Sequence, residues 1–370
     1  MDQPIRNLDR TRAALEQSLR DGLTPGAQVC IRRGGVIAAE LALGEARPGV
    51  AMTTDTLLSW MSMTKPIVAV GVLQQIERGH ARLDDPVARF LPEFAASGKA
   101  DITLRHLLTH TAGLRTALRG ESDLSWDEII ARICSAAPEP DWPLGGKAGY
   151  HIASSWYVLG EIVRRIDGRM IDAYVREAIF LPLGMDDCWL AMGPGDAARY
   201  GDRLGVLYKT GGSEPQPMGG DSPEQLMQVR PGASGRGPSN QLSRFFQMLL
   251  NGGELDGRRV LAESTVAEMT ARQRTGMIDQ TFGHVIDWGL GVMLNSAEYG
   301  HLATLPYNFG EFASRDAFGH GGAQSSIAFA DPGRDLVAVV ILNGQPGEPK
   351  HHRRMIPILR ALWEDIGFGT

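Results

Sequence analysis

Apolar residues recur at helical spacing through most of the chain and form strand-like runs near its two ends. Helical spacing predicts helices over residues 1–20, 64–78, 104–108, 126–136, 155–166, 170–180, 239–250, 262–272 and 353–366. Strand-like runs bounded by Gly, Asn, Asp and Pro occur at 27–32, 36–41, 288–294, 325–330 and 335–342. The first two runs predict a hairpin around a turn at 33–35. Strands at both ends with helices between them predict one sheet built from the two termini.

This order of elements predicts an α/β part combined with an all-α part. We expect an α/β domain with an antiparallel sheet at residues 1–80 and 240–370, and a mainly helical domain at residues 81–239. The helical part ends in a long Gly/Pro-rich loop at 210–238, and loops of such length are often functional. A chain of 370 residues, at roughly 150 residues per domain, is long enough for this arrangement.

Composition and charge exclude several classes of protein. Hydrophobic residues make up 43% and charged residues 22%, which is typical of a folded chain with a sizeable core. The longest apolar stretches fall short of the roughly 18 residues that a membrane span requires. Lys and Arg number 37 against 43 Asp and Glu, and the net charge of −6 argues against a nucleic-acid partner.

The cysteines and the first residues of the chain bear on its compartment. Cys30, Cys134 and Cys188 are odd in number and lack a C-x-x-C pairing, so neither a disulfide framework nor a cysteine zinc site is predicted. The first twenty residues carry acids and bases without the apolar core of a signal peptide. We therefore expect a cytoplasmic protein without a membrane partner.

Ser62 and Lys65 form an S-x-x-K pattern at the start of the predicted helix 64–78. Three residues make nearly one helical turn, so the hydroxyl and the amine can share a face. The positive end of the helix dipole favours a developing alkoxide there, and a partly desolvated lysine amine can accept the serine proton. A pattern this short also arises by chance, and an N-cap serine followed by a surface lysine would give the same letters.

Four further segments accompany this pattern: LDDPV at 83–87, ITLRHLLTHTAGL at 102–114, FLPLGM at 180–185 and FQMLLNGG at 246–253. In sequence and order the chain resembles the serine β-lactamase and penicillin-recognising family. The resemblance is to the class C-like branch, which includes family VIII carboxylesterases and D-amino-acid peptidases. It implies the β-lactamase/transpeptidase-like fold, an antiparallel sheet flanked by helices with an inserted helical domain. The active site is then expected in the cleft between the two parts.

The resemblance also implies a catalytic tyrosine, in the family's Y-x-N element before a helix that reads V-L-G-E-I-V. Tyr150 takes that place, and Tyr157, inside the helix, is the less favoured candidate. A phenol beside a lysine can pass a proton to the leaving group. Ile152 stands where the family has Asn, so the amide that binds the substrate's own amide is missing. His151 either supplies a replacement hydrogen bond to the substrate or only packs.

The family's third element, K-T-G or a variant on a strand facing the serine, is best matched by His320, Gly321 and Gly322 in the H-x-G form. Glycines there let a substrate approach the strand backbone closely. The resemblance implies an oxyanion hole made by the backbone N–H groups of Ser62 and Ala323. A literal Lys-Thr-Gly at 209–211 lies mid-chain with no strand after it, and we interpret it as a decoy.

These departures from the family pattern bear on the substrate. A mostly neutral His320 attracts a substrate carboxylate poorly, and together with Ile152 it indicates uncharged acyl groups. His106 and His110 have the spacing of a zinc-protease pair, but Leu107 replaces the required Glu, so we predict no metal. No nucleotide-binding glycine pattern follows a predicted strand, and we predict no cofactor.

We therefore expect a serine hydrolase that acts through an acyl-enzyme on small, mostly uncharged carboxylic esters, a carboxylesterase. A β-lactamase or D-aminopeptidase, an acyltransferase of secondary metabolism and a non-catalytic binding descendant are the alternatives. The partner in each case is a small-molecule ester or amide. The acyl chain, the oligomeric state and the roles of His151 and Arg236 stay open at this stage.

Overall fold

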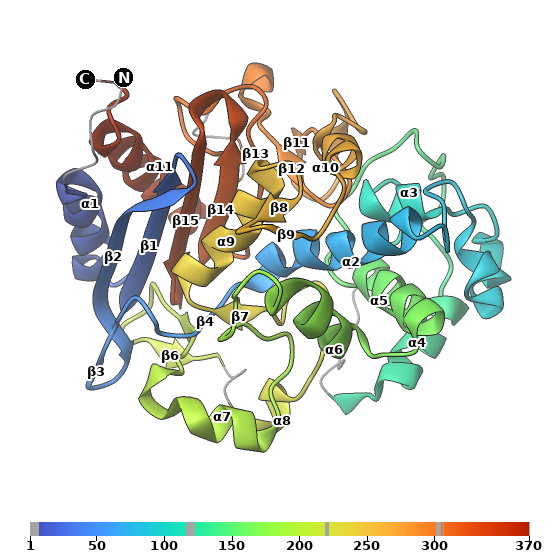
Figure 1. The fold of residues 1–370 in the computed structure, drawn as a ribbon, viewed down its shortest axis with the longest axis horizontal. Helices are drawn as coiled ribbons and strands as arrows, with labels where there is room; N and C mark the ends of the chain where they lie inside the picture. Colours follow the sequence, from blue (N-terminus) through green and yellow to red (C-terminus); the bar gives the residue numbers. More distant parts are fainter. Residues whose placement is uncertain (1–6, 116–122, 219–221, 301–304, 306, 370) are drawn as a thin grey trace.

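The structure is a computed structural model that describes residues 7–115, 123–218, 222–300, 305 and 307–369. Its centre is a seven-stranded antiparallel sheet with the strand order β12-β13-β14-β15-β1-β2-β3 (Figure 1). The strands are β1 (Gly26–Arg33), β2 (Val36–Arg47), β3 (Val50–Ala51), β12 (Met293–Leu294), β13 (Phe318–Gly322), β14 (Ser326–Asp331) and β15 (Leu336–Leu342). Strand β1 pairs with β15, so both ends of the chain contribute to one sheet, as the strand pattern predicts.

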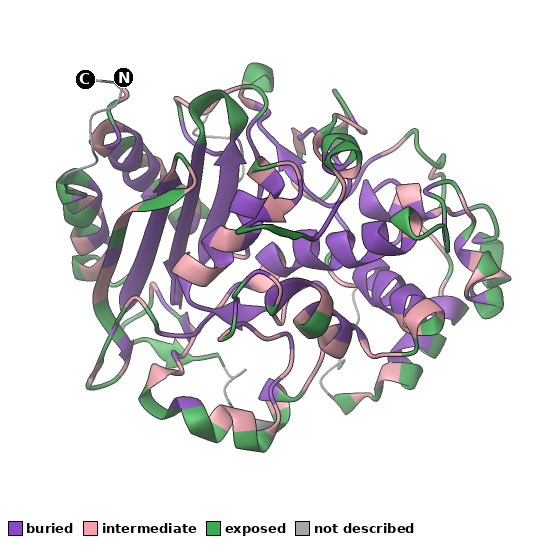
Figure 2. Cartoon of the chain, viewed as in Figure 1, coloured by how far each residue is buried: buried purple, intermediate pink, exposed green. Residues whose placement is uncertain are grey.

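The middle of the sheet is covered on both faces (Figure 2). Along β15, Val337, Val339 and Ile341 belong to one apolar cluster, whereas the alternate residues belong to another. The first cluster includes residues of α9 (Ser239–Leu250), and the second includes residues of α1 (Asp9–Arg20) and α11 (Glu348–Asp365). A strand buried on both faces is apolar at every position. This explains the purple centre of the sheet in Figure 2.

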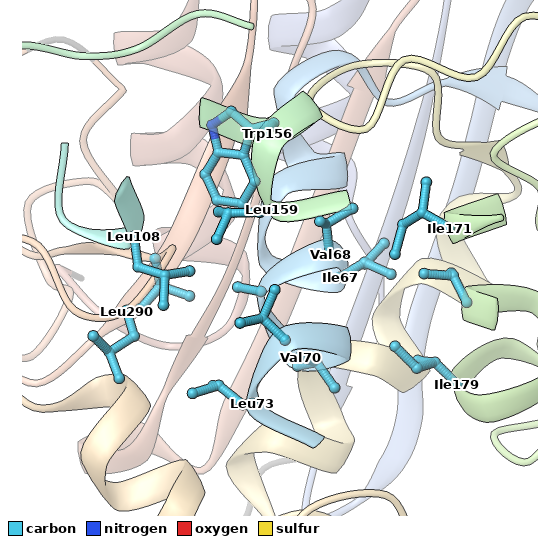
Figure 3. Packing of buried hydrophobic residues seen from close by; sticks show 14 of the residues in the cluster. Ile67, Val68, Val70, Leu73, Leu108, Trp156, Leu159, Ile171, Ile179 and Leu290 are labelled. Carbon is cyan, nitrogen blue, oxygen red and sulfur yellow. The ribbon is translucent and has the colours of Figure 1, made fainter. Parts of the chain in front are cut away.

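Beside the sheet lies a group of helices: α2 (Lys65–Glu77), α3 (Leu104–Leu108), α4 (Trp126–Ser135), α5 (Ser154–Asp167) and α6 (Ile171–Val175). Helix α2 is buried along nearly its whole length, which is why it is apolar all round. Figure 3 shows residues of α2 surrounded by apolar side chains from other parts of the chain: Leu108, Trp156, Leu159, Ile171, Ile179 and Leu290. This packing holds the first turn of α2 beside the sheet. The division into two domains at residues 80 and 239 stays a prediction.

The remaining elements are short. They are β4 (Leu58–Ser59), α7 (Pro194–Tyr200), β5 (Tyr208–Lys209), β6 (Gln216–Pro217), α8 (Pro223–Leu226), β7 (Arg236–Gly237), β8 (Glu254–Leu255), β9 (Arg258–Arg259), α10 (Glu263–Thr270), β10 (Ile278–Asp279), β11 (His284–Val285) and β16 (Gly344–Gln345). Single 3-10 turns lie at Met61–Thr64, Val87–Arg89, Gly201–Arg203, Ala297–Tyr299 and Pro332–Arg334, a kinked pair at Pro92–Gly98, and a π-helical turn at Arg176–Phe180. Within the described residues, none of the helices has the length and apolar content that crossing a membrane requires.

Two sequence predictions need correction. The strand expected at 288–294 is reduced to Met293–Leu294 because Gly289 and Gly291 form a tight turn, with the Gly289 N–H donating to the Val292 carbonyl at 2.9 Å. Gly291 has φ +78°, a left-handed conformation that a strand does not contain. The loop expected at 210–238 contains short elements of its own. Its strand β7 pairs with β4, which ends three residues before Ser62, so this loop holds the backbone that leads to Ser62.

Candidate active site

Ser62 lies in the 3-10 turn that leads into α2, and its hydroxyl contacts the lysine one turn on. Lys65 Nζ is 3.0 Å from Ser62 Oγ and donates a second hydrogen bond to the Gly232 carbonyl at 2.8 Å. The Lys65 side chain is fully buried. Met61, just before the serine, has φ +52°, a conformation that non-glycine residues rarely adopt and that clusters at functional sites.

Thr64 holds this turn in place. Its hydroxyl donates to the Met61 carbonyl at 2.6 Å and accepts from the Gly235 N–H at 2.9 Å. The second bond connects the turn to the segment that carries Gly232, the acceptor for Lys65. The nucleophile turn and the lysine are therefore held by one stretch of the 210–238 loop.

Tyr150 comes from a different part of the chain, the loop just before α5, and faces the same serine. Its ring centroid lies 5.0 Å from Lys65 Nζ. Burial raises the pKa of the Tyr150 phenol well above its usual value, and a hydrogen bond with Ser62 opposes this shift. The phenol is therefore protonated at neutral pH. Tyr157, the weaker candidate, packs inside the helical part against Trp126, with ring centroids 5.4 Å apart.

Asp279 fixes the backbone that carries Tyr150. Its Oδ1 accepts from the Tyr150 N–H at 3.0 Å and from the Thr281 N–H at 2.9 Å, and its Oδ2 accepts from Arg274 Nη2 at 3.1 Å. Thr281 Oγ1 donates in return to the Tyr150 carbonyl at 3.1 Å. Asp279 was not anticipated, because nothing in the local sequence pattern distinguishes it from a surface carboxylate, and its partners are distant in sequence.

The strand β13 ends against the nucleophile turn. A Cβ on Gly322 would lie 2.2 Å from Ser326 Oγ and 2.4 Å from the Trp60 carbonyl oxygen, so only glycine fits there. This contact brings the next residue, Ala323, to the pocket that Ser62 lines. Gln345 Nε2 donates to the Ala323 carbonyl at 2.6 Å and holds the strand end. The oxyanion hole expected from the N–H groups of Ser62 and Ala323 stays a prediction.

Most of the site residues expected from the sequence meet in one pocket of about 460 Å³. Its lining residues are Ser62, Tyr150, Ile152, Thr281, Phe282, Met293, Tyr307, His320, Gly321, Ala323 and Glu348. Ile152 is 61% exposed, so an apolar side chain stands at the pocket where the family has an amide. Phe282, Tyr307 and Glu348 were not anticipated, because they lie in segments without a chemical motif.

His320 is a neutral group in this pocket. Burial, with a contribution from the charge of Lys65, lowers the pKa of His320 to about 3. Its Nδ1 lies 2.7 Å from the Gly321 carbonyl, so Nδ1 carries the proton and donates it. As expected, this histidine brings no positive charge to the substrate at pH 7.

Of the two roles that the sequence leaves open for His151, the contacts of its side chain fit packing. This side chain is fully buried, and both ring nitrogens are occupied within the protein. Nε2 accepts from the Leu114 N–H at 3.2 Å, and Nδ1 is 2.7 Å from Ser155 Oγ. His151 therefore connects the start of α5 to the loop after α3 and does not reach the pocket.

Other candidates of the sequence analysis lie away from the pocket. Thr210, in the literal Lys-Thr-Gly, donates through Oγ1 to the Leu23 carbonyl at 2.8 Å, and β5 pairs with β16. His106 forms a capping box with Thr103 at the start of α3. No cluster of three or more metal-binding side chains occurs in the part of the chain that the structure describes. Arg236 of β7 lines a second cavity, of about 300 Å³, together with Met61.

Comparisons with known proteins agree with the family that the sequence motifs indicate. The model of the Beta-lactamase family matches residues 11–361. Esterase EstB of Burkholderia gladioli is 30% identical over 350 residues, which cover 84% of this chain and 85% of that protein. Among solved structures, a family VIII carboxylesterase is 26% identical with a TM-score of 0.80, over 99% of this chain and 98% of the other. A penicillin-binding protein homologue from Caulobacter crescentus is 29% identical with a TM-score of 0.78, over 96% and 97% of the two chains.

Proposed function

Because the chain belongs to the β-lactamase family, we propose that it is a serine carboxylesterase that hydrolyses small, mostly uncharged esters through an acyl-enzyme. One observation carries the proposal. Lys65 Nζ lies 3.0 Å from Ser62 Oγ, and Tyr150 stands across the same pocket. A nucleophile and a base in hydrogen-bond contact, with an acid facing them, are the requirements of acyl transfer.

Acylation begins when the Lys65 amine accepts the Ser62 proton and Oγ attacks the ester carbonyl carbon. The N–H groups of Ser62 and Ala323 hold the resulting oxyanion, each contributing roughly 3 kcal/mol in such sites. The C–O bond to the alcohol then breaks. Tyr150, protonated because burial raises its pKa, donates its proton to the departing oxygen and is reprotonated from Lys65.

Deacylation repeats these steps with water in place of the serine. The Lys65 and Tyr150 pair removes a proton from the water, whose oxygen attacks the acyl carbon. The bond to Ser62 Oγ breaks, the serine recovers its proton and the carboxylic acid leaves.

The charges around the pocket favour an ester over a β-lactam. β-Lactams and peptide C-termini carry a carboxylate, but none of the described pocket-lining residues is a lysine or arginine. His320 is neutral, and Glu348 adds a negative charge. Ile152 provides an apolar contact in place of a hydrogen bond to an amide. The relatives named as esterases support the same conclusion.

The test is to trap and locate the acyl group. Intact-mass measurement after mixing with 4-nitrophenyl butyrate should show one butyryl adduct, and peptide mapping should place it on Ser62. Ser62→Ala should remove both the adduct and the release of 4-nitrophenol, whereas Ser135→Ala, an exposed serine at the end of α4, should retain them. Undiminished turnover by the Ser62→Ala variant would refute the assignment.

A further inference from the structure

We propose that Glu348 and the aromatic rings next to it select esters whose alcohol part carries a positive charge, such as an alkylammonium group. The proposal rests on the esterase function and refines it: the acyl part stays uncharged and the leaving alcohol is cationic. Within the described pocket, Glu348 lies on the wall, no basic side chain forms a salt bridge with it, and aromatic rings connect it to Tyr150.

Glu348 is an exposed carboxylate on the wall of the catalytic pocket. It is the first residue of α11 and lines the same space as Ser62 and Tyr150. Both carboxylate oxygens accept from the Tyr307 hydroxyl, at 3.0 and 3.1 Å, which orients the group. The Tyr307 hydroxyl in turn accepts from the Gln324 N–H at 3.1 Å, beside the strand end that carries Ala323.

The charge of Glu348 is not balanced by a basic side chain. Its hydrogen-bond partner Tyr307 is neutral, since burial, and then the charge of Glu348, raise the pKa of this phenol well above its usual value. Throughout the described ranges, no lysine, arginine or histidine forms a salt bridge with Glu348. The positive end of the α11 dipole is a partial backbone charge and is not a basic side chain that pairs with the carboxylate. A cationic ligand group can therefore pair with it.

Aromatic rings connect this carboxylate to the reaction centre. The Tyr150 and Phe282 ring centroids are 5.0 Å apart, and those of Phe282 and Tyr307 are 6.1 Å apart. All three residues line the pocket. Ring faces attract cations, and aromatic cages are how proteins bind quaternary ammonium ligands. A carboxylate beside such rings adds the attraction of an opposite charge.

The cation belongs to the alcohol part of the ester because of the role of Tyr150. This residue protonates the leaving oxygen, and the rings lead from it to Glu348. Burial is the main reason that the pKa of Tyr150 is raised, and the negative charge of Glu348 adds to the shift, so this charge acts on the catalytic phenol.

The experiment compares two substrates of the same shape and different charge. Acetylthiocholine ends in a trimethylammonium group, and 3,3-dimethylbutyl thioacetate ends in an uncharged tert-butyl group. In each case Ser62 takes the acetyl group and the released thiol is measured with a thiol reagent. We expect kcat/KM about tenfold higher for the cationic substrate, within the roughly 2- to 30-fold range that cation–aromatic contacts support.

Two variants test the residue. Glu348→Gln keeps the shape and an acceptor for Tyr307, and it should lower the ratio of the two kcat/KM values several-fold, to the preference that the rings alone support. Glu311→Gln removes an exposed carboxylate that pairs with Arg360 outside the pocket, and it should leave the ratio unchanged. Inhibition of 4-nitrophenyl acetate turnover by choline and by 3,3-dimethylbutanol repeats the comparison without requiring thioester cleavage.

A ratio near one in the native enzyme, in both the turnover and the inhibition measurements, would overturn the inference. A ratio in Glu348→Gln that is unchanged from the native enzyme would do the same. Turnover of 4-nitrophenyl acetate that depends on Ser62 reports the esterase function separately. If this turnover is present and the charge ratio is near one, only the present inference fails; if it is absent, the proposed function fails.

Discussion

Replacing Asp279 tests whether the tyrosine is held in place by a buried ion pair. Asp279 and Arg274 are 0% and 2% exposed, and the carboxylate accepts the N–H groups of Tyr150, Thr281 and Phe282 at 3.0, 2.9 and 3.3 Å. Asp279→Ala leaves these donors without an acceptor, and it leaves the buried guanidinium without a counter-charge, bonded only to the Ile286 and Thr109 carbonyls. Asp279→Asn keeps one oxygen for the N–H groups, but places an amide NH₂ against Arg274.

The expected magnitudes follow from these contacts. Removing one partner of a buried ion pair costs about 3–5 kcal/mol, so Asp279→Ala should lower the unfolding free energy by that amount. Asp279→Asn loses one charge-assisted hydrogen bond, about 1.5–3 kcal/mol. Because the Tyr150 backbone is released, kcat should fall by about 100-fold in the alanine variant, as it does when a catalytic group shifts by about 1 Å.

The assays are urea unfolding and the steady-state hydrolysis of 4-nitrophenyl butyrate. The matched control is Asp316→Ala, since Asp316 pairs with Arg272 at 3.6 Å but its side chain is 75% exposed, and such pairs contribute about 0–1 kcal/mol. We expect KM to change less than kcat, because the lost function is proton transfer. A folded Asp279→Ala protein with native kcat and native stability would show that Tyr150 does not depend on this carboxylate.

Two further predictions concern the strand end and the histidines. Gly322→Ala should lower kcat/KM by at least about 100-fold, because a Cβ there lies 2.4 Å from the Trp60 carbonyl oxygen. The control Gly195→Ala should keep the native kcat/KM, because a Cβ at that position has no atom within 4 Å. Equal kcat/KM values for the two variants would disprove the close contact at Gly322. Burial lowers the pKa values of His151 and His320 from 6.5 to about 3, so between these pH values the unfolded chain binds more protons than the folded one. The free energy of unfolding should therefore fall as the pH drops below about 6.5, by about 1.4 kcal/mol per pH unit for each histidine. An unfolding free energy that does not change between pH 7.5 and pH 5 would contradict this prediction.

Much of the fold was predictable from patterns along the chain. The hairpin of β1 and β2, the buried strand β15 and helices α2, α5 and α9 match runs whose period reveals them. The prediction was wrong at 288–294, where two glycines turn the backbone. It also described 210–238 as a plain loop, although the loop gains its short elements by pairing with distant segments such as β4.

The part of the site that sequence could identify is the part set by local geometry and by resemblance. Ser62 and Lys65 are neighbours because three residues at the start of a helix bring side chains to one face. Tyr150, His320, Gly321 and Ala323 were recognised through family motifs, and all four line the pocket with Ser62.

Long-range packing decided the rest. Asp279 and Glu348 look like ordinary acidic residues in the sequence, and they become a backbone anchor and a pocket charge only when distant segments meet around Tyr150. His151 follows the tyrosine directly, yet its side chain points into the interior, away from the pocket. The physical reason is that spacing constrains neighbours on one helix or strand, whereas burial and charge depend on what the other elements place beside a residue.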